Sequence, residues 1–181
     1  MDDSLRGTLL IASPALQEPT FRRTVVLVTS HSDEGAMGLV LNRPSEARVS
    51  EAVPHLEHLV ADEEPVFVGG PVEPSAVTAL AELTDAAESA LPVFEAIGFL
   101  PADLGEEVEA ATIRARVFAG YAGWSAGQLE AELGESSWIL EPARVEDVFA
   151  ADPEALWSTV LRRKGAEFRV LALMPDDPRL N

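Results

Sequence analysis

The most informative stretch of the sequence is His31-Ser32-Asp33-Glu34-Gly35-Ala36-Met37-Gly38-Leu39-Val40-Leu41-Asn42-Arg43-Pro44. It contains one apolar run, Ala36–Leu41, and follows another, Thr24–His31. Both are rich in the apolar and β-branched residues that favour strands. The link between them is short and polar and ends in glycine, which predicts a hairpin. Because proline cannot donate a backbone hydrogen bond and restricts its predecessor, we expect the second strand to end at Asn42-Arg43-Pro44.

Further apolar runs along the chain predict more strands, and two polar segments predict surface structure. The strands are expected at Gly7–Ala12, Val66–Val68, Val93–Phe99, Ile113–Ala119, Ser137–Glu141 and Phe168–Leu173. Ala76–Leu83 is ambiguous, because its alanines and leucines favour a helix by propensity. His55–Glu64 is acidic and predicts a loop, and Pro175–Asn181 predicts a polar tail.

Capping residues predict where helices begin and end. We expect Ser50 to cap one helical turn that Pro54 closes. Ser125 and Gln128 have the spacing of a capping box, which predicts a helix that ends at Gly134. The Pro- and Glu-rich connection before Ile113 has room for a further turn of helix.

The last predicted helix has the clearest signals. Asp152-Pro153-Glu154 is typical of a helix start, and an apolar stripe follows it. Arg162-Arg163-Lys164 lie in the last turn and Gly165 lies just beyond. Cations are favourable there because they oppose the negative end of the helix dipole. We therefore interpret this basic run as structural and not as a phosphate-binding patch. The stripe consists of Leu156, Trp157, Val160 and Leu161.

Predicted strands cluster early and helices late, without regular β-α-β alternation, which favours the α+β class over a doubly wound sheet. Two other stretches complete the pattern: Val66-Phe67-Val68-Gly69-Gly70-Pro71-Val72 and Gly120-Tyr121-Ala122-Gly123-Trp124-Ser125-Ala126-Gly127-Gln128-Leu129-Glu130. With the quoted hairpin, Gly7–Pro14 and Phe21–Leu27, they resemble the AlgH/YqgE family of bacterial proteins from about Gly7 to Asn181.

The resemblance implies a single domain over residues 1–181. It implies an α+β fold in which a mixed, branched β-sheet folds into a flattened pseudo-barrel with peripheral helices, and it implies that Ala76–Leu83 is a strand. The family carries no established biochemical activity, so the resemblance implies no substrate.

Composition excludes several classes of protein. Of the 181 residues 47% are hydrophobic and 24% charged, as in ordinary globular proteins. The net charge of −18 argues against partners with phosphate backbones and against anionic membranes. Without cysteine there are no disulfides or thiolate sites. No signal peptide and no apolar run of about 18 residues is present. We therefore predict a cytoplasmic protein that binds neither nucleic acid nor membrane.

Two short motifs suggest chemistry but lack the residues that would complete it. Gly123-Trp124-Ser125-Ala126-Gly127 spells the nucleophile elbow G-x-S-x-G, but no histidine follows His58 to complete the triad. We interpret Ser125 as a helix cap. His55 and His58 could share a helix face and bind a metal, but two imidazoles are too few ligands. No catalytic residue, metal or cofactor is predicted.

Eight residues form the predicted ligand or interaction surface. His31 lies at a strand end, where it caps backbone carbonyls or binds a ligand. Arg43 offers a fork for a carboxylate or phosphate, against the alternative of an internal salt bridge. Gly69 and Gly70 supply amides for an anion, or mark a bulge or close backbone crossing. The remaining four are Asn42, which suits a turn after a strand, and the ligand-wall, interface or core candidates Tyr121, Trp124 and Gln128.

These residues favour a non-enzymatic cytoplasmic protein that binds another protein or a small ligand, with a role in regulation. The alternative is a small-molecule or nucleotide-binding enzyme in which Arg43, His31 and the Gly69-Gly70 amides hold an anion. A DNA-binding transcriptional regulator ranks third because of the charge. Convergence of these residues in one pocket would favour the enzyme. The identity of the partner and the oligomeric state remain open at this level.

Overall fold

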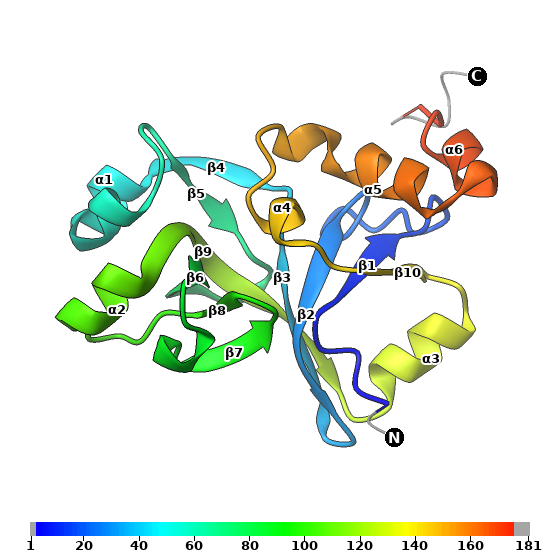
Figure 1. The fold of residues 1–181 in the computed structure, drawn as a ribbon. Coiled ribbons are helices and arrows are strands. Elements are labelled where there is room, and N and C mark those ends of the chain that lie inside the picture. Colours follow the sequence, from blue (N-terminus) through cyan, green and yellow to red (C-terminus); the bar gives the residue numbers. More distant parts are fainter. Residues whose placement is uncertain (1–2, 176–181) are drawn as a thin grey trace.

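The computed structural model describes residues 3–175, which form ten strands and six α-helices with three short 3-10 helices (Figure 1). The strands are β1 (Thr8–Ala12), β2 (Val25–Ser32), β3 (Gly35–Val40), β4 (Pro44–Arg48), β5 (Pro65–Val68), β6 (Val72–Leu83), β7 (Leu91–Phe94), β8 (Ile97–Phe99), β9 (Thr112–Ser125) and β10 (Trp138–Pro142). The helices are α1 (Val49–Ala52), η1 (Pro54–Leu59), η2 (Ala86–Glu88), α2 (Glu106–Ala111), α3 (Gln128–Gly134), α4 (Val145–Val148), η3 (Pro153–Ala155), α5 (Leu156–Lys164) and α6 (Ala166–Leu171).

All ten strands belong to one mixed, branched sheet, which confirms the predicted α+β class. The order is β10-β1-β2-β3-β9-β6-β8-β7, with antiparallel neighbours throughout. Outside this path, β5 pairs in parallel with β9 and antiparallel with β4. The strand predicted at Ala76–Leu83 lies within β6, and the predicted hairpin joins β2 to β3 through Asp33 and Glu34.

The branch lies on β9, which is long enough to serve three neighbours. β6 occupies one edge of β9, while β3 and β5 follow one another along the other. In Figure 1, β9 runs from the lobe with α1, α2 and β4–β8 to the lobe with β1–β3, β10 and α3. This strand therefore fixes how the two lobes meet.

The sheet stays open, but its two ends approach each other. Within residues 3–175, β10 and β7 each have one strand neighbour. Gly7 directly precedes β1, and a Cβ built on it would lie only 2.9 Å from the Cβ of Phe94 at the end of β7. The sheet thus curls round its core, as the predicted pseudo-barrel requires.

Strands β1 and β2 are buried on both faces, which explains why they are continuous apolar runs rather than alternating ones. Leu9 and Leu27 face the main core, together with the two aromatic rings of Phe67 and Phe118. The opposite face belongs to a second core under α3. That core includes Leu10, Val26, Trp124, Leu129 and Trp138.

Helix α5 confirms the predicted stripe and stop, while the predicted cap Asp152 caps the 3-10 turn η3 and the cap position of α5 itself is Ala155. The Asp152 carboxylate accepts from the backbone N–H of Ala155, and the 3-10 turn η3 leads directly into α5. The predicted stripe is buried, and Trp157 donates its indole N–H to the Ala12 carbonyl oxygen at 2.9 Å. The helix ends at Lys164, directly before Gly165.

Two predicted strands are wrong. Val93–Phe99 is not one strand: β7 ends at Phe94 and β8 begins at Ile97, with Glu95 in the left-handed backbone region (φ 43°) between them. No Gly or Asn marks that turn. Phe168–Leu173 is not a strand either, because Ala166–Leu171 forms α6. Its side chains at positions 168, 171 and 172 pack on the main core with helical spacing.

Smaller corrections concern the segment after β4. Ser50 lies inside α1, whose cap position is Arg48, so Ser50 is not the predicted cap. The predicted loop His55–Glu64 begins with the 3-10 helix η1, in which Leu56 is buried. The predicted turn of helix before Ile113 is confirmed as α2. The predicted tail, apart from Pro175, lies outside the described residues. Among residues 3–175, no helix has the length and apolar character that a membrane crossing requires.

Candidate functional site

His31 fastens the N-terminal segment and α3 to the sheet. Its Nδ1 accepts from the Leu5 backbone N–H at 3.0 Å, and its Nε2 lies 2.6 Å from Oε1 of Glu130. Because Nδ1 is an acceptor, the neutral ring carries its proton on Nε2 and donates it to the carboxylate. Both ring nitrogens of His31 are therefore used inside the protein.

Glu130 gives a pH-dependent prediction. The hydrogen bond from His31 lowers the pKa of the Glu130 carboxyl below its ordinary value. A lowered carboxyl pKa stabilises the fold above the unfolded pKa, and this stability is lost as the pH falls through the folded pKa. We expect Glu130→Gln to lower the urea midpoint slightly at pH 7, since Glu130 is exposed, and the difference from wild type to shrink as the pH falls from the unfolded pKa through the folded pKa. A difference that stays constant over this range would contradict the role of the carboxylate.

Asn42 and Arg43 hold the loop between β1 and β2. Asn42 accepts from the Val25 N–H at 3.0 Å and donates to the Arg23 carbonyl at 2.8 Å. The Arg43 guanidinium donates to the backbone carbonyls of Thr20, Pro19 and Arg22 at 2.5, 2.9 and 3.0 Å. Burial lowers the pKa of Arg43. Its hydrogen-bond partners are thus carbonyl oxygens, and no salt bridge joins Arg43 to a carboxylate within residues 3–175.

Gly69 and Gly70 form the close backbone crossing that was the alternative to an anion site. The Gly69 N–H donates to the Ala119 carbonyl at 2.8 Å, so this amide is occupied. A Cβ on Gly69 would lie 2.3 Å from the Gly120 carbonyl oxygen, and one on Gly70 would lie 2.1 Å from the carbonyl carbon of Tyr121. The Tyr121 side chain is half-buried against the main core.

Trp124 and Gln128 belong to a network centred on Glu132, a residue that the sequence analysis did not identify. The Glu132 carboxylate accepts from the indole N–H groups of Trp124 and Trp138 at 2.9 and 2.8 Å, and from the Gln128 amide at 3.1 Å. The two indole rings meet edge to face, with centroids 6.1 Å apart. This network holds α3 on the second core.

The G-x-S-x-G motif does not form a nucleophile elbow. Ser125 is the last residue of β9, and α3 begins at Gln128 with Gly127 at its cap position, so Ser125 is not the predicted cap. One half of the predicted capping box is present, since the Gln128 side chain accepts from the Ser125 N–H at 3.0 Å. The Ser125 hydroxyl also donates to Gln128, at 3.3 Å. No histidine contacts it in the described part of the chain.

The histidine pair also lacks a metal site. His55 is exposed on η1, and His58 lies 3.1 Å from Oε1 of Glu109 on α2. Over residues 3–175, no three His, Asp or Glu side chains come close enough together to hold a metal ion.

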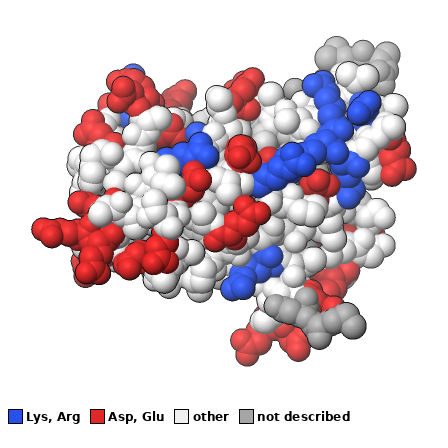
Figure 2. All heavy atoms as spheres, viewed as in Figure 1, with Lys and Arg blue, Asp and Glu red and all other residues white. Residues whose placement is uncertain are grey.

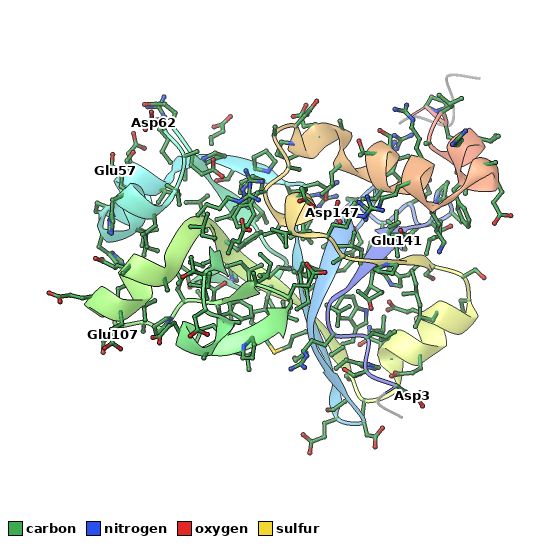
Figure 3. The ribbon with its side chains drawn as sticks, in the orientation of Figure 1. Asp3, Glu57, Asp62, Glu107, Glu141 and Asp147 are labelled. Atoms are coloured by element: carbon green, nitrogen blue, oxygen red, sulfur yellow. The ribbon has the colours of Figure 1, made fainter. Side chains whose placement is uncertain are left out.

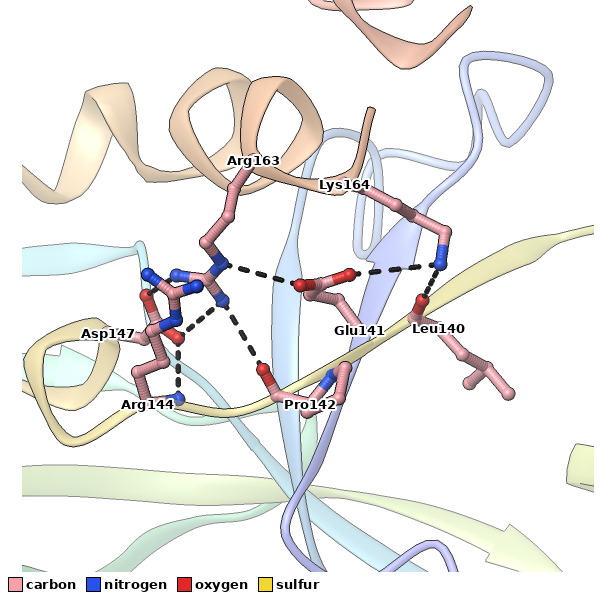
Figure 4. A network of polar contacts seen from close by, with 7 residues as sticks. All are labelled: Leu140, Glu141, Pro142, Arg144, Asp147, Arg163 and Lys164. Carbon is pink, nitrogen blue, oxygen red and sulfur yellow. Dashed lines mark hydrogen bonds and ion pairs between the residues drawn. The ribbon is translucent and has the colours of Figure 1, made fainter. Parts of the chain in front are cut away.

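The basic run at the end of α5 has the predicted structural role, within a network of polar contacts (Figure 4). Arg163 donates through both Nη atoms to the buried Asp147 carboxylate, at 2.8 and 2.9 Å, and the Arg144 N–H donates to the same carboxylate at 2.8 Å. This bidentate bond raises the pKa of Arg163. Glu141, on β10, lies 3.5 Å from the Arg163 Nε.

The same run covers the open edge of β10. Lys164 donates to the Leu140 carbonyl at 2.5 Å, and Arg163 donates to the Pro142 carbonyl at 3.3 Å. The Ala143 N–H donates to the Gly7 carbonyl. Because backbone groups alternate along a strand, those of the odd-numbered residues of β10 point towards β1, and those of the even-numbered residues point away from it at the open edge. The side chains of α5 therefore occupy backbone acceptors that another strand would otherwise use.

Arg116 and Glu64 form a buried ion pair that the sequence analysis also missed. The Arg116 Nε donates to Glu64 at 2.7 Å, and its Nη1 donates to the Val148 and Ala150 carbonyls at 3.2 Å each. Burial lowers the pKa of Arg116, while the charge of Glu64 opposes that shift. The pair joins β9 to α4 and to the turn before β5.

The eight predicted residues therefore do not converge on one site. His31, Trp124 and Gln128 bond to the surroundings of α3, the Arg43 guanidinium faces the Pro19–Arg22 loop, and Gly69-Gly70 pack on the β9 backbone. Six of the eight have hydrogen-bond partners within the protein, namely His31, Asn42, Arg43, Gly69, Trp124 and Gln128. These contacts stabilise the fold and hold the eight residues at three separate places.

A different surface carries the features of a binding site. A hollow of about 570 Å³ lies between η1, the edge of β6 and the chain that follows β8, and we call it the apolar groove. Val77 and Leu91 in its wall are 45% and 47% exposed. Large apolar side chains gathered at an open hollow are typical of an interaction site. It is lined by Val53, His55, Leu56, Val77, Thr78, Ala79, Leu91, Phe99, Leu100, Pro101 and Ala102.

The apolar groove lies within the most acidic part of the chain. Between Val49 and Ile113 the sequence has fourteen Asp and Glu residues and no Lys or Arg. In Figure 2 the acidic side chains gather at the end with α1 and α2, and the basic ones form a band along α5. Figure 3 shows Glu57, Asp62 and Glu107 pointing outward at that end, while Asp147 lies beneath α5. This run without basic residues is the sequence signal that could have located the surface.

Comparisons with known proteins give the relatives of the chain. The model of the AlgH-like family matches residues 9–169. A "UPF0301 protein" of Thermobifida fusca is 44% identical over 98% of this chain and 96% of its own length, and one of Streptomyces avermitilis is 41% identical over the same shares.

Two solved structures are similar in fold. A crystal structure of a protein from Corynebacterium diphtheriae has a TM-score of 0.85 and 26% identity over 93% of this chain and 91% of that one. The solution structure of the AlgH protein from Pseudomonas aeruginosa has a TM-score of 0.72 and 28% identity over 97% and 96%.

Proposed function

The chain belongs to the AlgH-like family, and from this premise and the geometry of the apolar groove we propose that it is a cytoplasmic, non-enzymatic binding protein that holds a polypeptide partner in the groove. The observation that supports this proposal is the contrast between two sets of residues. His31, Arg43 and the Gly69 amide are hydrogen-bonded within the fold, whereas the groove wall presents Val77 and Leu91 to solvent.

The chemistry of the groove wall supports binding over catalysis. Among the described residues that line it, His55 is the one titratable side chain, and the others are apolar apart from Thr78. General acid–base or nucleophilic catalysis requires at least two positioned groups within reach of a substrate. An apolar wall instead gains free energy when it is covered, at roughly 25 cal/mol per Å².

The alternative enzyme draws no support from the geometry. It requires the Arg43 guanidinium, His31 and the Gly69-Gly70 amides at one anion. Arg43 donates to three backbone carbonyls, His31 bonds to Leu5 and Glu130, and the Gly69 N–H donates to Ala119.

The proposal is tested with a groove variant that introduces two positive charges, Val77→Arg/Leu91→Arg, and with Ile113→Arg as the matched control. Ile113 is 56% exposed on β9 and does not line the apolar groove. We expect quantitative affinity capture from the host lysate to recover a polypeptide in stoichiometric amounts with wild type and with the control, and at least tenfold less with the groove variant. Equal thermal melting temperatures establish that all three chains are folded.

Two outcomes would overturn the proposal. One is capture of the same proteins, in the same amounts, by wild type and the groove variant. The other is a stoichiometric small-molecule adduct in native mass spectrometry of the gently purified protein, which would favour a ligand-binding or enzymatic function.

A further inference from the structure

Val77 lies on β6 in the wall of the apolar groove, and within residues 3–175 its backbone has no hydrogen-bond partner on the β8 side. Leu83 and Ala79 bond to the β8 side, through Leu83 N–H to the Ala96 carbonyl and Leu100 N–H to the Ala79 carbonyl. Backbone groups of an antiparallel strand alternate between its two neighbours. The backbone N–H and C=O groups of the odd-numbered residues of β6 therefore point towards β8, and those of the even-numbered residues point towards β9.

The pairing of β6 with β8 reaches only as far as Ala79 and leaves the earlier residues of β6 without a β8 neighbour. The register pairs Leu80 with Phe99 and continues to Leu100 opposite Ala79, so Ala102 would lie opposite Val77. Within residues 3–175, no backbone hydrogen bond joins Ala102 to Val77. The N–H and C=O of Val77 thus point from the sheet edge into the apolar groove.

An open edge beside an apolar hollow fits an extended segment better than a helix. A helix uses its backbone donors and acceptors internally, so it cannot bond to Val77. An added strand pairs with the edge through its main chain and places alternate side chains into the pocket. The apolar wall at Leu56, Leu91 and Phe99 would receive those side chains.

The negative charge around the groove indicates the charge of the partner. The stretch from Val49 to Ile113 supplies fourteen of the 31 acidic residues and none of the basic ones. A second copy of this chain, at −18, would be repelled if it presented the same face. Glu57 and Glu107 present exposed carboxylates at the end of the molecule with α1 and α2 (Figure 3), and this acidic surface would attract basic side chains on the solvent side of an added strand.

Resting on the proposed function, we propose that the partner contributes an extended, cationic segment that adds as a strand to β6 at Val77. Its apolar residues alternate with Lys or Arg. The apolar residues fill the groove and the basic ones face the acidic surface. The main chain of the segment exchanges hydrogen bonds with the N–H and C=O of Val77.

The test uses a displayed library of random twelve-residue peptides, selected on the full chain and counter-selected on the Val77→Arg/Leu91→Arg variant. We expect enriched peptides to be net positive, with apolar residues at every second position. Binding of an enriched peptide should weaken steeply between 50 and 500 mM salt. In titrations followed by amide NMR, the Val77 N–H signal should shift on binding.

The backbone hydrogen bonds between Val77 and the added strand are tested by changing the protein and by changing the peptide. Because Val77 does not bond to β9, Val77→Pro removes one N–H at the edge without breaking the sheet, and we expect about three- to tenfold weaker binding. N-methylation of the peptide residue opposite Val77 should cause the same loss and needs no change in the protein. Unchanged affinity after N-methylation of each peptide amide in turn would overturn strand addition.

Other outcomes separate this inference from the proposed function. Enriched peptides with apolar residues at helical spacing would overturn the extended partner but leave a polypeptide-binding groove. A concentration-dependent dimer in sedimentation, lost in the groove variant, would identify a second copy as the occupant and overturn the cationic segment. No enrichment over the groove variant, together with equal capture by both chains from lysate, would overturn both proposals.

Discussion

We expect Gly70→Ala to lower the free energy of unfolding by more than about 4 kcal/mol, a large part of the stability of a typical domain. A Cβ at this position would lie 2.1 Å from the Tyr121 carbonyl carbon and 2.3 Å from the Ala122 nitrogen. These are backbone atoms of β9, so relief requires that the crossing of β5 and β9 open. Since β9 joins the two lobes, the loss would be global and would appear in thermal and urea unfolding monitored by circular dichroism.

Gly134→Ala is the matched control, because a Cβ there meets nothing within 4 Å and the residue lies in α3. Alanine is the better helix former by up to about 1 kcal/mol, so we expect unchanged or raised stability. A Gly70→Ala protein that melts at the wild-type temperature would show that the two backbones do not cross this closely.

The second large effect is expected from Arg116→Met. It removes a buried guanidinium and leaves the Glu64 carboxylate and the Val148 and Ala150 carbonyls without their donor. Breaking a buried ion pair from one side costs about 3 to 5 kcal/mol, because the remaining charge stays desolvated. Urea unfolding at pH 7 measures this cost.

A double-mutant cycle separates the ion pair from the carbonyl bonds. In Arg116→Met/Glu64→Leu no charge is left unpaired, so we expect a loss smaller than that of Arg116→Met alone. The exposed pair Arg48–Glu63 has the same 2.7 Å distance and serves as the control. Arg48→Met should cost at most about 1 kcal/mol. Equal costs for Arg48→Met and Arg116→Met would contradict a role for burial.

Local signals predicted the parts of the fold that local chemistry determines. Asp152, Pro153 and Gly165 act within a few residues of themselves, so the start and end of α5 could be read directly. The turn at Glu95 has no Gly or Asn to reveal it, and it was missed. The spacing of Phe168 and Leu171 suits a helix, but in a short apolar run it resembles a buried strand.

The candidate site could not be predicted in the same way, because the partners of its residues lie far along the chain. Arg43 bonds to carbonyls more than twenty residues away, and His31 contacts Glu130 at a separation of 99. Nothing in the residue types distinguishes such internal bonds from ligand contacts. The apolar groove depends on where β8 stops pairing with β6, and only the tertiary register shows this.

The contact of α5 with β1 also determines the order in which the newly made chain can fold. The Ala12 carbonyl accepts a hydrogen bond from the Trp157 indole, and Trp157 is translated 145 residues after Ala12. At roughly 5 to 20 residues per second, that delay is about 7 to 30 s. During this time the face of β1 that carries Leu9 and Ile11 lacks the cover of α5, and for most of it β10 and α3 are also still to be made. During synthesis on the ribosome, the apolar residues of β1 are therefore uncovered for an interval in which the chain can aggregate. The full-length chain has no such interval when it refolds from denaturant.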